Sequence, residues 1–452
     1  MDRATARPEV SAVPGDRARE WIRGHGAVAA PSEASHPFVW DAGAEARGPF
    51  CTDVDGNVFL DFTSHIGAAP LGYNNEKIRE RLDEFSLVTP LKIAGHDFFY
   101  SAGQDADGAD LPASRQLMDA LTDLTDHYGL DTVFLSNSGA EAVENAMKIA
   151  YAHSEVPKYA LTFSGGFHGR TLGTLSLTRA GDVYTRKYPE VSGVRELPFC
   201  ADSGCDAASC ECGFFAGGES RLRSMVSPGG PVDPSELAYV VLEPVQGVGG
   251  YHFPSDAFMR EVNDVCREYD VPVIVDEIQT GMGRSGEWWA ADHYSIEPDV
   301  VASAKALRVG ATVGRSELFP DEKNRLGSTW GGGDVLSSML GVFTIEAIQE
   351  YDLLDNATER GEQVKERLRD ADLPGVVDVR GLGLLLAVEF DSAERRDAVT
   401  EAAFKRGLLL VGCGERTVRL LPPLDVTERE VELGVSLLVD AVAEVAAPVD
   451  AD

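Results

Sequence analysis

The sequence predicts an α/β protein, with a large domain built on a mostly parallel sheet and a smaller α/β domain after it. The chain has 452 residues, 44% hydrophobic and 25% charged, enough apolar residues for more than one core. From about residue 110, short apolar runs alternate with amphipathic stretches, a pattern typical of parallel strands covered by helices on both faces. From about residue 340, a long helical stretch leads into shorter strands.

The elements follow this pattern along the chain. Residues 1–50 look irregular, and 59–62 are expected to form a short strand. The remaining expected strands lie within 132–137, 159–164, 238–245, 271–278, 299–305, 376–390, 408–413 and 417–424, and the main helices within 139–153 and 258–269. We therefore expect three parts: an N-terminal segment that joins the small domain (1–100), the large domain (101–340) and the C-terminal small domain (341–452).

The composition is strongly acidic. Asp and Glu number 74 against 40 Lys and Arg, a formal net charge of −34, which repels nucleic acid and anionic membranes. The acidic residues are dispersed and only nine residues are lysine, which suggests a surface suited to high salt. No run approaches the roughly 20 apolar residues of a membrane helix, and residues 1–14 lack the apolar core of a signal peptide. We expect a cytoplasmic protein.

Four of the seven cysteines, Cys200, Cys205, Cys210 and Cys212, crowd into one Gly- and Ser-rich stretch. Such a group could hold a metal ion, but spacings of four, four and one intervening residues are not a standard zinc pattern. The final Cys-x-Cys is short for tetrahedral chelation. We favour reduced loop thiols and expect no metal.

Two charged residues follow neighbouring strands of the large domain. In sheets of this kind, ligands bind beyond the carboxyl ends of the strands. Asp276 ends the apolar run "VPVIVD", where an uncompensated charge is costly, and Lys305 follows the next run, "DVVASAK". A bound cationic group, such as a protonated pyridinium ring, would neutralise the carboxylate of Asp276.

Two turns end other strands of the same sheet. Ser138, Gly139 and Ala140 open a helix, whose free N–H groups can hold an anion, and Phe167 and His168 lie in a glycine-rich turn. Alone, the first is an ordinary helix N-cap and the second ordinary packing. Combined with an Asp and a Lys from the same layer, they indicate a site for a phosphorylated, cationic heterocycle.

The order and spacing of these segments resemble the class III family of pyridoxal-phosphate-dependent aminotransferases, which have fold type I, from about Phe38 to Val439. The resemblance implies pyridoxal 5'-phosphate as cofactor and transfer of an amino group to an oxo acid such as 2-oxoglutarate or pyruvate. The implied donor is an ω-amino acid such as 4-aminobutyrate, ornithine or lysine, or an α-amino acid such as alanine. It also implies a homodimer with shared active sites.

The resemblance assigns roles by position. Lys305 matches the lysine that bonds to the cofactor and shuttles the substrate proton, and Asp276 matches the partner of the pyridine nitrogen. The other implied cofactor contacts are Gln279 at the ring hydroxyl, Ile278 and Phe167 on the two ring faces, His168 in support, Ser138, Gly139 and Ala140 at the phosphate, and Thr329 reaching the phosphate from the neighbouring subunit.

The implied substrate contacts are fewer. Arg380, in "VRGLG", matches the arginine that binds the substrate α-carboxylate, Ile66 matches a residue of the pocket, and Glu243 opens the segment "EPVQG". Arg419 also matches a recurrent family position and is interpreted as structural.

Departures from the family pattern leave the substrate open. Val248 stands where ω-amino-acid members carry a glutamate gate, which favours an α-amine donor or a pyruvate- or glyoxylate-type partner and resembles the alanine–glyoxylate branch. The segments after Lys305 and around "STWGG" are instead similar to lysine 6-aminotransferases, and "GHDFFY" (95–100) resembles archaeal members, some of which are amino-acid racemases. A racemase, or a non-catalytic scaffold that retains the fold, remains the alternative.

Overall fold

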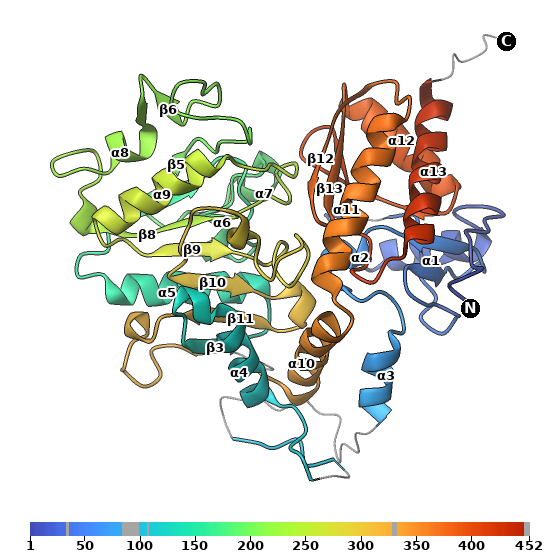
Figure 1. The fold of residues 1–452 in the computed structure, drawn as a ribbon, viewed down its shortest axis with the longest axis horizontal. Coiled ribbons are helices and arrows are strands. Elements are labelled where there is room, and N and C mark those ends of the chain that lie inside the picture. Colours follow the sequence, from blue (N-terminus) through green and yellow to red (C-terminus); the bar gives the residue numbers. More distant parts are fainter. Residues whose placement is uncertain (33–35, 84–98, 106–107, 328–331, 447–452) are drawn as a thin grey trace. The chain divides into compact units, whose positions relative to one another are not determined.

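The computed structural model describes residues 1–32, 36–83, 99–105, 108–327 and 332–446. The chain forms two compact units, one of Met1–Arg79 together with Tyr351–Asp452 and one of Glu80–Glu350 (Figure 1). We call them the small and the large unit. Their boundaries lie near residues 79 and 350, against the expected 100 and 340.

The large unit is built on a seven-stranded sheet in the order β3-β11-β10-β9-β8-β4-β5 (Figure 1). All neighbouring strands are parallel except β11, which runs antiparallel to both β10 and β3, so the prediction of a mostly parallel sheet is confirmed. The strands are β3 (Thr132–Ser136), β4 (Tyr159–Phe163), β5 (Val194–Leu197), β8 (Leu237–Leu242), β9 (Val273–Asp276), β10 (Val300–Ser303) and β11 (Gly310–Gly314).

Alternation along the central strands separates two hydrophobic cores. In β9, Val273 and Val275 pack with helix α9 (Asp256–Glu268), whereas Ile274 packs with helix α5 (Gly139–His153). Because side chains of a strand alternate between faces, the two helices cover opposite faces of the sheet. This layering is the one expected from the apolar runs, and it leaves the carboxyl ends of the strands to carry polar residues.

The other elements of the large unit are short, apart from the helices at its two ends. They are α4 (Ser114–Thr125), α6 (Leu172–Leu175), α7 (Asp182–Thr185), β6 (Phe215–Ala216), β7 (Glu219–Ser220), α8 (Arg221–Met225) and α10 (Val335–Glu350). Helix α10 packs against α4.

The small unit has two small sheets. One has the order β1-β2-β14 and the other β12-β13-β16-β15. Strand β1 was not predicted, and the other strands lie within one residue of the predicted ranges. Its strands are β1 (Phe50–Thr52), β2 (Val58–Asp61), β12 (Val376–Leu382), β13 (Leu385–Phe390), β14 (Leu408–Leu409), β15 (Val411–Cys413) and β16 (Thr417–Leu420). Its helices are α1 (Asp16–Gly26), α2 (Ser64–Gly67), α11 (Leu353–Asp370), α12 (Ala393–Lys405) and α13 (Glu428–Ala446), with α3 (Glu76–Asp83) at the boundary.

The helices correct one expectation, that residues 1–50 are irregular, and agree with another, that the chain has no membrane-spanning helix in its described residues. Residues 1–50 are not wholly irregular, because 16–26 form α1, whose single fully buried residue, Ala18, gives too narrow an apolar stripe to see in the sequence. None of the helices in the described residues combines the length and the apolar content needed to cross a bilayer.

Candidate active site

The predicted Asp and Lys lie at the ends of neighbouring parallel strands. Asp276 is the last residue of β9 and is only 3% exposed. Its register partner on β10 is Ala302, and the N–H of Glu277 donates to the Ala302 carbonyl (2.9 Å). Lys305 follows β10 at the same edge of the sheet, at the start of a short 3₁₀ turn, and is half-buried. Strand pairing therefore brings the carboxylate and the amine to one edge.

A histidine holds the buried carboxylate in place. Nδ1 of His168 lies 2.8 Å from Oδ2 of Asp276, and both side chains are almost fully buried. The other oxygen, Oδ1, accepts the N–H of Ile278 (3.1 Å). His168 was expected only as a support, and the bond shows what it supports: it fixes the rotamer of Asp276.

Glu243 braces the turn that carries Phe167 and His168. Its two carboxylate oxygens accept the N–H groups of Phe167 (2.8 Å) and Gly247 (2.9 Å), and the residue is 6% exposed. Burial raises the pKa of Glu243 to about 7, with repulsion from Asp276 adding to it and His168 opposing it. Because both oxygens are engaged by the backbone, the geometry favours a positioning role over the predicted contact with substrate.

The N-terminus of α5 reaches the same edge. Ser138 is its N-cap and accepts the N–H of Glu141 (3.2 Å), which leaves Gly139 and Ala140 as the first helical residues. The first N–H groups of a helix have no intrahelical acceptor and carry the positive end of its dipole. This terminus can therefore hold a phosphate.

Close approaches at glycines show which side chains surround this terminus. A Cβ added at Gly139 would lie 2.8 Å from Cδ1 of Ile278, and one at Gly169 would lie 2.9 Å from Cβ of Ala140. A Cβ at Gly247 would lie 2.6 Å from Oε1 of Gln279. The predicted residues 138–140, 278 and 279 therefore belong to one region, although they lie far apart in the sequence.

Phe167 presents an aromatic ring at this edge and is half-buried. Its ring packs edge-on against Tyr184, with 5.3 Å between centroids, and the Arg170 guanidinium lies 5.9 Å from its centroid. The turn that carries it is held by Gln246, whose Nε2 donates to the Ser164 carbonyl (2.7 Å). The sequence analysis did not assign Gln246 a role. Its position in the segment "EPVQG", directly after a strand, was the signal that could have identified it.

These residues fit pyridoxal 5'-phosphate. Asp276 is a buried anion with one oxygen bonded to His168 and the other to a backbone N–H, and a protonated ring nitrogen would neutralise it. The α5 terminus suits a phosphate, and Lys305 supplies an amine at the same edge of the sheet. The donor set therefore matches the three chemical ends of this cofactor.

The predicted substrate residues Ile66 and Arg380 lie in the small unit. Ile66 is 40% exposed and ends a run of three non-glycine residues with left-handed backbone, Ser64 (φ 44°), His65 (φ 52°) and Ile66 (φ 59°). Such strain concentrates at functional sites. Bonds hold the turn: the Ser64 hydroxyl donates to the Leu421 carbonyl (2.6 Å), and the Ser64 N–H donates to Asp61 (3.2 Å).

Ile66 lines a cavity of about 370 Å³ within the small unit. Its other lining residues are His36, Phe38, Asp61, Thr63, His65, Tyr73, Leu409, Leu410 and Val411. The left-handed turn was not predicted, because Ser and Ile do not favour this backbone conformation and one His is too weak a signal for it.

Arg380 already has two carboxylate partners. Its guanidinium nitrogen Nη1 lies 2.8 Å from Asp378 and 2.6 Å from Glu389. Ala387 on β13 pairs with both Arg380 on β12 and Arg419 on β16, so the two arginines share one face of this sheet. Arg419 is the more buried of the two, at 6% exposed. Two bound carboxylates weaken the argument that Arg380 takes a third from the substrate.

The last predicted positions are Thr329, the segment 95–100 and Val248. Thr329 lies outside the described residues, as does most of the segment 95–100. Val248, in place of the family's glutamate, is half-buried in the turn after β8.

A lysine and a histidine-bound carboxylate at neighbouring strand ends, beside a helix N-terminus, define a pyridoxal-phosphate-dependent transferase of fold type I. The chain belongs to the class III aminotransferases, whose family profile, described as aminotransferase class-III, matches residues 32–442. The resemblance on which the sequence interpretation rested is thereby confirmed.

Relatives and solved structures agree with this assignment. The chain is 32% identical to the acetylornithine aminotransferase of Corynebacterium efficiens, over 88% of this chain and 91% of that protein, and 32% identical to that of Archaeoglobus fulgidus, over 87% and 93%. The lysine aminotransferase structure from M. tuberculosis superposes with a TM-score of 0.81 at 26% identity, covering 96% of this chain and all of that one. The chain is an aminotransferase that uses pyridoxal 5'-phosphate.

Proposed function

We propose that this enzyme removes the terminal amine of a basic amino acid, of the ornithine, acetylornithine or lysine type, and passes it to an oxo acid such as 2-oxoglutarate. The proposal rests on one geometric observation, the meeting of Asp276, held by His168, with the strand end that carries Lys305. Its substrate class is supported by the relatives, which act on acetylornithine and lysine.

The residues divide the chemistry among themselves. Bound pyridoxal 5'-phosphate supplies a reactive carbonyl and a protonated ring that withdraws electrons. Lys305 would hold the cofactor and move the proton at the substrate carbon that bears the transferred amine, since its own amine follows a strand end and is half-buried. Asp276, kept in one rotamer by His168, would keep the ring nitrogen protonated.

Positioning falls to the surrounding residues. Gly139 and Ala140 would bind the phosphate through backbone N–H groups, with Ser138 beside them and Thr329 from a second subunit. Gln279 would hold the ring hydroxyl, while Ile278 and Phe167 would cover the two ring faces. Glu243 would hold the Phe167 turn by its two backbone bonds.

Two arginines are candidates for binding the substrate carboxylate. Arg380 is the sequence-based candidate, but Asp378 and Glu389 compete for it. Arg419 shares its sheet face and is the alternative. Steady-state kinetics of Arg380→Gln and Arg419→Gln separate them: the variant at the binding residue raises KM for the oxo acid by about tenfold or more.

A donor comparison tests the substrate proposal. The purified enzyme is assayed with ornithine, acetylornithine, lysine and alanine as donors, each with 2-oxoglutarate and with pyruvate. We expect the highest kcat/KM with a terminal-amine donor and 2-oxoglutarate. Transfer from alanine alone would contradict it and would favour the second candidate, an α-amine transaminase, to which Val248 points.

The Val248→Glu variant examines that second candidate. If position 248 acts as the glutamate gate of the ω-amino-acid members, a carboxylate there should shift preference toward terminal-amine donors, because it would neutralise the carboxylate-binding arginine while the carboxylate-free end of the donor is bound. A donor ratio that stays unchanged, with Val248→Gln as the size-matched control, would show that position 248 does not act as a gate.

We also propose a homodimer with shared active sites, a cytoplasmic location and adaptation to high salt. The dimer rests on the match of Thr329, the location on seven cysteines without a disulfide, and the salt adaptation on the net charge of −34. Light scattering at several protein concentrations tests the dimer.

A further inference from the structure

Four cysteines gather in the connection between β5 and β8. Cys200 and Cys205 are buried in the hydrophobic cluster that α9 forms with the sheet, and Cys210 and Cys212 are half-buried beside it. This connection, residues 198–236, also carries the short hairpin of β6 and β7. The aminotransferase chemistry makes no use of it.

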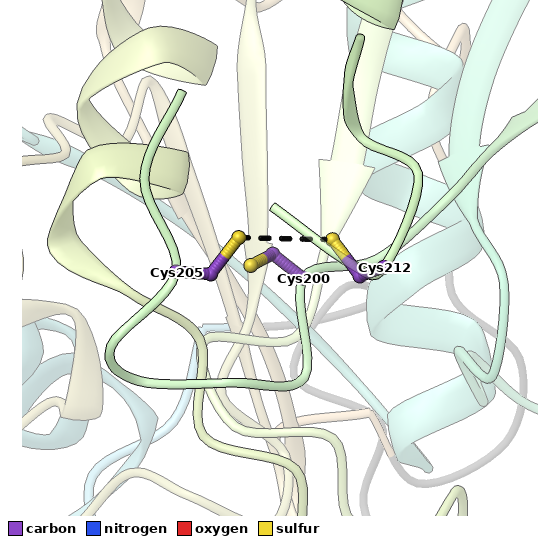
Figure 2. Close-up of side chains that lie close together, drawn as sticks. All are labelled: Cys200, Cys205 and Cys212. Atoms are coloured by element: carbon purple, nitrogen blue, oxygen red, sulfur yellow. Dashed lines mark hydrogen bonds between the residues drawn. The ribbon is translucent and has the colours of Figure 1, made fainter. Parts of the chain in front are cut away.

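Their sulfur atoms converge. Figure 2 shows the side chains of Cys200, Cys205 and Cys212 pointing toward one another from different parts of the loop. The three sulfurs all lie within 4.8 Å of one another, and those of Cys205 and Cys212 are 4.0 Å apart. The sulfur of Cys210 lies 3.2 Å from that of Cys212. Three thiols from different parts of the loop thus meet, and the sulfur of Cys210 lies against one of them.

This spacing suits a tetrahedral metal better than disulfides. A zinc–sulfur bond of about 2.3 Å places the corners of a tetrahedron about 3.8 Å apart, and the observed sulfur–sulfur distances of 3.2 and 4.0 Å lie on either side of that length. A disulfide requires sulfurs about 2.05 Å apart and joins only two of the four. All four are free.

The backbone after the last cysteine supports negative sulfurs. Gly213 has a left-handed backbone (φ 82°), which turns the chain back over the cluster. The N–H of Phe215 then donates to the sulfur of Cys210 (3.3 Å). N–H donors stabilise thiolates, the form that binds metal. The short Cys-x-Cys argued against chelation in the sequence, but the structure places its two sulfurs on the same side, 3.2 Å apart.

We propose that Cys200, Cys205, Cys210 and Cys212 bind one zinc ion in a closed, structural site. Each thiol releases its proton to solvent as its sulfur binds the metal, and no electron is transferred. Four protein ligands leave no open position, so the ion fastens the loop and takes no part in amine transfer.

The site connects to the catalytic turn through the residue before it. The N–H of Phe199, which precedes Cys200, donates to the Ser164 hydroxyl (3.0 Å), and Ser164 begins the turn that carries Phe167 and His168. The sulfur of Cys200 also lies 3.8 Å from the hydroxyl of Ser255, the N-cap of α9. Zinc would therefore fix a loop that packs beside the cofactor region.

Metal analysis tests the proposal directly. Enzyme purified without chelator or added metal should contain about one zinc per chain by plasma mass spectrometry, and Cys212→Ser should lose it. Cys266→Ala is the matched control, because Cys266 is buried in the same hydrophobic cluster but is not one of the proposed zinc ligands. This variant should keep its zinc. Cobalt exchanged into the wild-type enzyme should give thiolate charge-transfer bands, a readout that does not depend on the variant folding.

The contrary outcomes are equally clear. The proposal would be overturned if wild-type enzyme held less than about a tenth of an equivalent of zinc and gave no cobalt bands. Iron in place of zinc would also overturn it, as would a disulfide among these cysteines detected by non-reducing mass spectrometry. Limited proteolysis adds a second readout: removal of zinc should expose cleavage sites within 198–236, and an unchanged pattern would show that the metal does not fasten the loop.

Discussion

At the scale of single residues, the account depends on a buried carboxylate and the histidine that holds it. Asp276 could be found from the sequence, because an acidic residue ending an apolar run is costly without a partner. Its bond to His168 could not, since His168 lies in the turn after β4 and Asp276 ends β9, and only the intervening strand β8 brings these two segments to one edge of the sheet.

His168 is expected to act through Asp276. His168→Ala should lower kcat about 10- to 100-fold, because the lost bond to a charged group is worth roughly 1.5–3 kcal/mol. His168→Asn, which can place an amide N–H near the position of Nδ1, should recover part of the loss. Equal losses in both variants would show that His168 does not work by orienting Asp276.

Glu243 and Arg380 mark where residue-level inference from sequence is weakest. Both were assigned to substrate by their motifs, and the structure gives each of them two protein partners. A motif identifies a residue type at a position, but whether its charge is already satisfied depends on neighbouring strands. Their roles toward substrate stay predictions.

At the scale of elements, the parallel strands and α5 were predictable because their signals are local. Strands of apolar residues and a helix opened by a small polar cap need no tertiary information. Three features could not be predicted: the antiparallel β11, the helix α1 and the left-handed turn at 64–66. Strand direction and backbone strain are decided by packing partners.

Gly310 shows how tightly β11 fits against β3. A Cβ there would lie 2.3 Å from the carbonyl oxygen of Ser138 and 2.4 Å from the hydroxyl of Ser136. Gly310→Ala should lower the free energy of unfolding by about 1–3 kcal/mol, measured by urea denaturation, and should displace the N-terminus of α5. Gly327→Ala, where a Cβ meets nothing within 4 Å, serves as the control. Similar stability in both would contradict the packing described.

At the scale of the whole molecule, the dominant feature is its negative charge. The net charge of −34 makes the folded chain repel itself, and dissolved ions screen that repulsion. Raising KCl from about 0.1 M to about 1 M, which shortens the Debye length from about 10 Å to about 3 Å, should raise the midpoint of thermal unfolding. A midpoint that falls or does not move would refute adaptation to high salt.

The family could be predicted from the sequence, whereas the substrate could not. The family places its phosphate site, its aspartate and its lysine in a fixed order along the chain, and that order is visible at residues 138–140, Asp276 and Lys305. We expect donor choice to depend on a few side chains, such as those at 66, 248, 380 and 419, that lie far apart in the sequence.

One measurement tests the central claim most directly, that the cofactor is held by the amine at the end of β10. The holoenzyme is reduced with sodium borohydride, digested and mapped by mass spectrometry. The account predicts a pyridoxyl group on Lys305 and on none of the other eight lysines. A label on a different lysine, or enzyme that takes up pyridoxal 5'-phosphate without labelling Lys305, would contradict it.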